Sequence, residues 1–172
     1  MNKKTSFIFA VMLILLAAFS RLLPHPMNFA PITAIALFGG VYFNGKFSPI
    51  LPMAALLISD LFLGFYEGIA WVYGSFLLIV ALGLLIRRYK TVPVVFGAAV
   101  AGSLLFFLIT NFGVWQAGLF YTKDFTGLVE CYTAAIPFYR NSVMGDLFYV
   151  TVMFGVYELA MKYLPKVQST KA

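Results

Sequence analysis

The stretch that decides the fold class is residues 69–86, which read IAWVYGSFLLIVALGLLI and contain no charged residue. Eighteen residues of α-helix rise about 27 Å, which is close to the hydrocarbon thickness of a bilayer, roughly 30 Å. The lipid interior offers no water to exposed backbone groups, so a stretch of this kind is stable there as a helix. We therefore predict a transmembrane helix over residues 69–86.

Five further apolar stretches surround this one, and Pro, Gly and charged residues separate them. Most are long enough to cross a bilayer, which requires roughly 17–25 residues. We therefore predict an all-α fold: a single transmembrane domain over residues 1–172, built as a polytopic bundle of about six membrane helices. The predicted spans cover residues 6–23, 29–43, 49–65, 69–86, 92–120 and 143–164.

Two segments need separate interpretation. Residues 126–137 are apolar but too short to cross a bilayer, so we expect a short extracytoplasmic or re-entrant helix there. Lys3 and Lys4 precede the apolar core of the first span, and Ala17-Ala18-Phe19-Ser20 follows that core, as in a cleaved signal peptide. We expect this span to be retained, because its apolar stretch is long and the cleavage site is poor.

Composition excludes several classes of protein. The chain is 62% hydrophobic and only 10% charged, whereas soluble domains are roughly 45–50% apolar. The twelve Lys and Arg give a net charge of +6 but form no stripe, so we predict no nucleic-acid partner. Cys131 is the only cysteine, which excludes an intrachain disulfide and a CxxC metal site; we predict no metal and no cofactor.

The distribution of Lys and Arg predicts the orientation, because basic residues near helix ends favour the cytoplasm. With the N-terminus inside, six spans also place the C-terminus inside. The outer side then receives only Arg21, Lys123 and Arg140. The inner side receives the other nine basic residues, which are Lys3, Lys4, Lys46, Arg87, Arg88, Lys90, Lys162, Lys166 and Lys171.

This orientation sorts the acidic residues as well, because every one except Glu158 falls in the outer half. Asp60 and Asp146 lie inside predicted helices, where each costs at least a few kcal/mol unless it is paired or hydrated. Arg21 and Arg140 are the cations at that depth, and a guanidinium can grip a carboxylate with two hydrogen bonds. Such pairs would either fasten helices together or face a ligand.

Other polar and aromatic residues gather in the same half. Asn111 and Trp115 are four residues apart and share one helix face. His25, between two prolines, is either a hydrogen-bonding loop residue or part of the site, and Ser142 is expected to cap the last span. The aromatic residues form an interfacial belt or line a cavity. The predicted substrate-binding residues are Arg21, His25, Asn28, Asp60, Trp71, Asn111, Trp115, Tyr132, Arg140, Asn141 and Asp146.

Two further patterns bear on function. The fifth span carries small residues four apart, at Gly97 and Ala101, Ala98 and Gly102, and Ala99 and Ser103, which permits close helix packing within the bundle or against a partner. The sequence contains none of the motifs of zinc proteases, serine hydrolases, Walker ATPases or dinucleotide-binding enzymes. We therefore predict a non-enzymatic protein without catalytic residues.

Several motifs together resemble an uncharacterised family of small bacterial membrane proteins described as putative transport proteins. They include residues 20–29 (SRLLPHPMNF), Ser59-Asp60 with Gly64-Phe65-Tyr66, Asn111-Phe112, and residues 137–141 (PFYRN) followed by Gly145-Asp146. The resemblance spans nearly the whole chain. That family is similar in turn to the substrate-binding S components of energy-coupling factor (ECF) transporters, in size, in its six spans and in its outward polar residues.

The resemblance implies a multi-pass protein of the bacterial cytoplasmic (inner) membrane that binds a vitamin-like small molecule at its outer face. It also implies as a partner a transmembrane coupling subunit with ATPases. The first span, however, lacks the small-residue AxxxA docking motif often found in S components, so the fifth span would have to replace it.

Three hypotheses about function remain open at this point. The chain is a substrate-binding subunit or a small transporter, whose partners are the lipid bilayer and a small-molecule ligand. Alternatively, it is a scaffold of a membrane complex, which predicts no enclosed cavity. The third is a membrane enzyme in which Asp60 and Asp146 act as an acid/base pair, which requires the two carboxyl groups to meet.

Overall fold

The computed structural model describes residues 3–163, which form six α-helices and no strand. The helices are α1 (Lys3–Ser20), α2 (Ile32–Tyr42), α3 (Phe47–Leu63), α4 (Ile69–Ile86), α5 (Val92–Ala117) and α6 (Phe125–Tyr163), with a 3-10 turn, η1 (Arg87–Tyr89), after α4. The all-helical class and the six helices are thus confirmed. Four of them, α1, α4 extended through η1, α5 and α6, are long and apolar enough to cross a membrane, whereas α2 and α3 are shorter.

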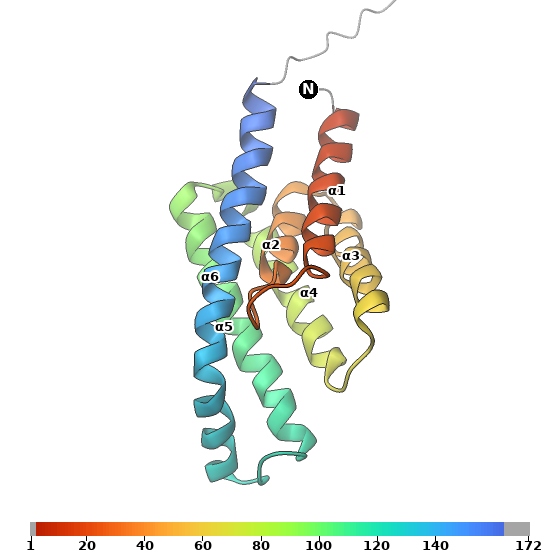
Figure 1. The fold of residues 1–172 in the computed structure, drawn as a ribbon. Helices are drawn as coiled ribbons and strands as arrows, with labels where there is room; N and C mark the ends of the chain where they lie inside the picture. Colours follow the sequence, from red (N-terminus) through yellow and green to blue (C-terminus); the bar gives the residue numbers. More distant parts are fainter. Residues whose placement is uncertain (1–2, 164–172) are drawn as a thin grey trace, which may run out of the picture.

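Successive helices alternate in direction, so their connections face two opposite sides of the bundle; the α1–α2 connection lies about level with the middle of α6, whereas the α5–α6 connection lies at the far end (Figure 1). The start of α1, the α2–α3 connection, η1 and the end of α6 lie at one end, which we call the basic end. Arg87 donates a hydrogen bond of 2.6 Å to the Phe43 carbonyl there. This end holds all described residues of the predicted inner set, which are Lys3, Lys4, Lys46, Arg87, Arg88, Lys90 and Lys162. Lys166, Lys171 and the last residue of the predicted sixth span lie outside the described residues.

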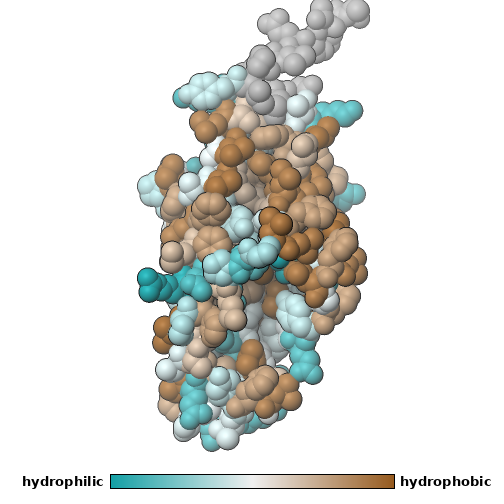
Figure 2. All heavy atoms as spheres, in the orientation of Figure 1, coloured by the Kyte–Doolittle hydropathy of each residue, from teal (hydrophilic) through white to brown (hydrophobic). Residues whose placement is uncertain are grey.

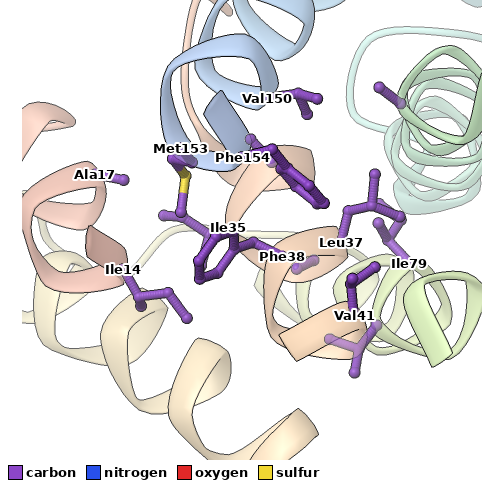
Figure 3. Close-up of a cluster of buried hydrophobic side chains, with 14 of the residues drawn as sticks. Ile14, Ala17, Ile35, Leu37, Phe38, Val41, Ile79, Val150, Met153 and Phe154 are labelled. Carbon is purple, nitrogen blue, oxygen red and sulfur yellow. The ribbon is translucent and has the colours of Figure 1, made fainter. Parts of the chain in front are cut away.

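Helix α2 lies in the centre of the bundle and contacts each of the other five α-helices. Nine of its eleven residues are buried. Figure 3 shows Ile35 and Phe38 of α2 among side chains of α1 and α6, including Ile14 and Phe154. A helix that is apolar all round fits such a position, because no face of it meets water.

Glycines set the distance between α2 and α4. A Cβ atom on Gly40 would lie 2.3 Å from the Val80 carbonyl oxygen, and one on Gly83 would lie 2.6 Å from the Leu37 carbonyl oxygen. Both separations are too short for a side chain, so the two backbones touch. The small residues of α5 do not all serve such packing. Gly102 packs against Thr33 of α2, whereas a Cβ on Gly97 would meet nothing within 4 Å.

The last third of the chain differs from the prediction. Residues 126–137 are not a separate re-entrant helix, and the last helix does not begin near residue 143. Instead α6 runs unbroken from Phe125 to Tyr163, with Pro137 inside it. Phe107 of α5 holds both sides of this proline, since its ring contacts those of Tyr132 and Tyr139, at 5.6 and 4.8 Å between centroids.

The start of α6 has a different cap from the one expected. Asp124 Oδ1 accepts hydrogen bonds from the Gly127 N–H, at 2.7 Å, and from the Thr122 hydroxyl, at 2.9 Å. These bonds, the Gly127 N–H first, lower the pKa of Asp124. Ser142, predicted as the cap, lies within the helix, where its hydroxyl donates to the Phe138 carbonyl at 3.2 Å. The capping residue is therefore Asp124, which stands just before the apolar segment 126–137 and not after it.

Candidate functional site

A cavity of about 330 Å³ opens beside the α1–α2 connection, residues 21–31. The ends of α1 and α3 and the start of α2 meet there, all of them facing away from the basic end (Figure 1). Teal residues lie among brown ones in the part of Figure 2 where Figure 1 draws this connection. The lining combines polar and apolar side chains: Arg21, His25, Asn28, Thr33, Tyr66, Ser142 and Asp146 with Ala30, Ile32, Leu63 and Phe106.

The Arg21–Asp60 pair fastens the end of α1 to α3. Arg21 Nη2 lies 2.8 Å from Asp60 Oδ1, and the two side chains are 7% and 0% exposed. The other carboxylate oxygen accepts a hydrogen bond of 2.9 Å from the Tyr73 hydroxyl, and Arg21 Nη1 donates to the Ser59 hydroxyl. Arg21 lines the cavity, while Asp60 lies behind it and does not. This carboxylate is thus neutralised within the protein.

Asp146 is the second buried carboxylate, and it has no cationic partner among the described residues. It is 3% exposed and lines the cavity. The Ser103 hydroxyl of α5 donates a hydrogen bond of 2.5 Å to Asp146 Oδ2, and Thr33 is a further hydrogen-bonding neighbour. Thr33 belongs to the first turn of α2, where backbone N–H groups have no partner within the helix and the dipole favours an anion. Neither of the two arginines predicted as available partners, Arg21 and Arg140, forms an ion pair with this carboxylate.

The α1–α2 connection is held against α6 by contacts on both sides of the cavity. Asn141 Nδ2 donates a hydrogen bond of 3.1 Å to the Met27 carbonyl. Gly145 lets the connection approach, because a Cβ there would lie 3.1 Å from the Phe29 Cα. Asn28 has a φ of 60°, a left-handed conformation that asparagine tolerates better than most residues. A residue held in such a conformation beside a cavity is a frequent feature of binding sites.

The positions of the protons can be assigned for two further lining residues, His25 and Tyr66. The Nδ1 atom of His25 lies 2.9 Å from the Pro26 carbonyl oxygen, which can only accept, so Nδ1 carries the proton. In the neutral ring Nε2 is then an acceptor. Burial, followed by the Asp60 charge, raises the pKa of Tyr66, so its hydroxyl keeps its proton. The cavity therefore offers both an acceptor and a donor besides its charged groups.

A smaller cavity of about 70 Å³ adjoins the first, because Asn28, Phe106 and Ser142 line both. Asn111 lines this smaller cavity, while its amide donates to the Phe107 carbonyl at 2.8 Å. Trp115 does not share it: the indole N–H donates to the Thr122 carbonyl at 2.9 Å, in the α5–α6 connection. Asn111 and Trp115 thus have different hydrogen-bond partners, and Trp115 lines neither of the two cavities.

Three other predicted residues lie away from the larger cavity. Trp71 packs on Gly113 of α5 and makes an edge contact with Phe112, at 5.5 Å between ring centroids. The Tyr132 hydroxyl donates to the Leu108 carbonyl at 2.6 Å. Arg140 is exposed and makes no ion pair with any described residue. Trp71 and Tyr132 contribute to packing between helices, and neither lines either of the two cavities.

Sequence reasoning missed Ser103, Thr33 and Ser59 as polar partners. Ser103 was noted only for its size, yet a hydroxyl in the middle of a long apolar helix is a signal in itself, since it needs a partner in lipid. Gly145 was noted as part of a motif, but its role in seating the α1–α2 connection depends on which helix faces which. That signal is absent from a single sequence.

The basic end carries a second, different hollow. A groove of about 510 Å³ lies between α5 and α6, lined mostly by apolar side chains such as Val95, Phe96 and Phe154. Glu158 accepts at its rim from Lys90, at 2.5 Å, and from the Tyr42 hydroxyl, at 2.7 Å. Both members of this ion pair are about half exposed, so water and salt screen it.

Metal ligands do not gather in the described part of the chain: residues 3–163 contain no group of three His, Cys, Asp or Glu side chains placed to hold an ion. Comparison with known proteins adds a family but no activity. The family model described as "Family of unknown function (DUF6580)" matches residues 1–168. No curated protein and no solved structure is significantly similar to the chain.

Proposed function

For this chain, which belongs to DUF6580, a family of unknown function, we propose a role in capturing a small molecule on the extracytoplasmic side of a bacterial cytoplasmic membrane. It would act as a substrate-binding subunit or as a small transporter. The observation that carries the proposal is the cavity of about 330 Å³ with buried charged side chains in its wall. Pockets for small ligands are typically 300–1,000 Å³, mostly apolar, with a few placed polar groups.

The position of the cavity supports capture from outside. It opens among helix ends that face away from the basic end, and basic residues favour the cytoplasm. The proposed topology is therefore six spans with both termini inside. Transport against a gradient would need a coupling subunit with ATPases, because the chain has no Walker motif of its own.

The competing functions have less support. A scaffold needs no polar cavity, whereas buried ionisable groups in a membrane bundle are costly and commonly mark ligand or ion pathways. An acid/base pair requires contact between Asp60 and Asp146, yet the described contacts give them different partners, Arg21 and Tyr73 for one and Ser103 for the other.

The binding test uses the protein purified in detergent. We expect a small molecule to co-purify, or a compound from a panel of vitamins, nucleobases and metal ions to raise the unfolding temperature. Ser142→Phe should abolish the effect, because Ser142 lines both connected cavities. Thr151→Phe is the matched control: it places the same ring on the same helix, in the groove at the basic end. Indifference to the whole panel, with no molecule extracted, would count decisively against capture.

Orientation is tested separately by thiol labelling in whole cells. A cysteine at Lys123, in the α5–α6 connection, should react with a membrane-impermeant reagent in a Cys131→Ser background. A cysteine at Lys46, in the α2–α3 connection, should react only after permeabilisation. The reverse pattern would place the cavity on the cytoplasmic side and overturn the proposed direction of capture.

A further inference from the structure

We propose that the ligand of the 330 Å³ cavity carries a positive charge, a protonated amine or amidine that pairs with Asp146. The inference rests on the proposed capture function and names its substrate class. It follows from the charges that surround the cavity and the partners that each one already has.

The charges around the cavity do not cancel. Arg21 is the single cation of the lining, and its charge is met by Asp60, 2.8 Å away in the wall behind it. Asp146 then adds a second carboxylate with no cation among the described residues. When Asp146 is ionised, one cation against two carboxylates leaves a net charge of −1 at the site.

The partners of Asp146 orient the carboxylate without neutralising it. Ser103 and Thr33 are neutral groups, and they belong to two different helices, α5 and α2. The N-terminus of α2 contributes at most about half an elementary charge. Ionisation of a carboxyl buried in a membrane bundle is unfavourable, and a cationic ligand group beside Asp146 would offset that penalty, whereas Ser103 and Thr33 cannot.

The rest of the lining suits the same class of ligand. His25 Nε2 is an acceptor when its ring is neutral, and the Asn28 side chain adds an amide oxygen, so N–H groups of a ligand would find partners. Ile32, Leu63 and Phe106 provide apolar and aromatic surface for a ring. An anion would meet the opposite situation, because Arg21 is already engaged by a carboxylate.

The test compares pairs of probes that share a shape and differ in charge. Benzamidine and benzamide are one pair, and phenethylammonium and phenethyl alcohol are another. Purified protein in detergent should bind each cation at least about tenfold more tightly than its neutral partner at pH 7, measured by thermal shift or calorimetry. Equal binding within both pairs, or no binding of either cation, would overturn the inference.

Variants then locate the charge. Asp146→Asn should bring the two members of each pair to about equal affinity, while Glu158→Gln, which removes a carboxylate at the basic end, should keep the preference. A preference that survives Asp146→Asn would contradict the inference. The wild-type comparison stands even if this variant does not fold.

The two proposals can fail separately. If a neutral or anionic compound stabilises the protein and Ser142→Phe abolishes the effect, capture stands and the positive charge of the ligand is rejected. If nothing binds at all, both are rejected.

Discussion

Asp60 and Asp146 are the two buried carboxylates among the described residues; Asp146 lines the cavity and Asp60 lies behind its wall, and the two are held in opposite ways. Asp60 has a guanidinium at 2.8 Å and a tyrosine hydroxyl at 2.9 Å, and it is sealed from the cavity. Asp146 has hydroxyl partners and a helix N-terminus, and it reaches the cavity wall. The same residue type thus has two roles: Asp60 fastens α3 to the end of α1, whereas Asp146 can pair with a group that enters the cavity.

This difference shows why a charged residue in a membrane helix does not by itself reveal its role. A carboxylate that is paired with a cation inside the protein fastens two helices together. Its removal leaves the cation buried without a counter-charge. A carboxylate that has only neutral hydrogen-bond donors can still gain electrostatic free energy when a cationic ligand binds beside it. Substitutions that treat the two carboxylates alike should therefore have unequal effects.

The largest effect is expected from Asp60→Asn. It leaves Arg21, 8% exposed, as a buried cation without its counter-charge, and breaking such a pair typically costs about 3–5 kcal/mol. The free energy of unfolding in mixed detergent and SDS should fall by that amount. The double variant Arg21→Met with Asp60→Leu should recover much of the loss, because both charges are then absent. A loss in Asp60→Asn below about 1 kcal/mol would show that the pair is not buried as described.

The next largest loss of stability is expected where Gly145 of α6 packs against the α1–α2 connection. Gly145→Val would push against Phe29 and Ala30 and should destabilise by about 1–3 kcal/mol, as overpacking does. It should also weaken ligand binding, because the connection lines the cavity. Gly155→Val is the matched control on the same helix: a Cβ there meets nothing within 4 Å. Equal losses of unfolding free energy in the two variants would mean that helix propensity, not the connection, determines the result.

Asp146→Asn is expected to change stability far less than Asp60→Asn. An asparagine oxygen can still accept from Ser103, and the variant removes an uncompensated charge, so the unfolding free energy should stay within about 1 kcal/mol of the wild type. The same SDS titration measures both variants side by side. A loss as large as that of Asp60→Asn would reveal a cation near Asp146 and remove the contrast between the two sites.

Glu158→Gln should have the smallest effect. The Lys90–Glu158 pair is about half exposed on both sides, and exposed pairs contribute roughly 0.2–1 kcal/mol that salt reduces. The variant should shift the unfolding midpoint slightly at low ionic strength and not at all in about 0.5 M salt. A large, salt-independent loss would instead assign the pair a buried role in closing the groove between α5 and α6.

Much of the helix arrangement was readable in advance, for a clear physical reason. Apolar length and charge-free stretches determine where a chain can cross lipid, and the described helix over residues 69–86 coincides with the predicted span. The prediction was wrong in the last third of the chain, where contacts between helices, and not composition, determine the structure. Residues 126–137 were expected to form a separate short helix, yet α6 continues through Pro137, where Phe107 of α5 packs on Tyr132 and Tyr139.

The candidate site was only half readable. Its ionisable members, Arg21, Asp60 and Asp146, stood out because charge in an apolar segment is rare. Their pairing did not follow from sequence, since Arg140 lies on an exposed part of α6 and Arg21 alone reaches a carboxylate. Ser103 looked like one small residue among many.

What the sequence alone indicated is the class of the protein: an apolar, helical chain with nine of its twelve basic residues at one set of helix ends and every acid except Glu158 in the other half. The preference of each residue type for lipid or water is largely a property of that side chain, so it can be read from one sequence. Which carboxylate has a cation and which does not was decided by tertiary structure. That outcome depends on distances of a few ångströms between residues far apart in the chain, such as the 2.8 Å from Arg21 to Asp60 and the 2.5 Å from Ser103 to Asp146.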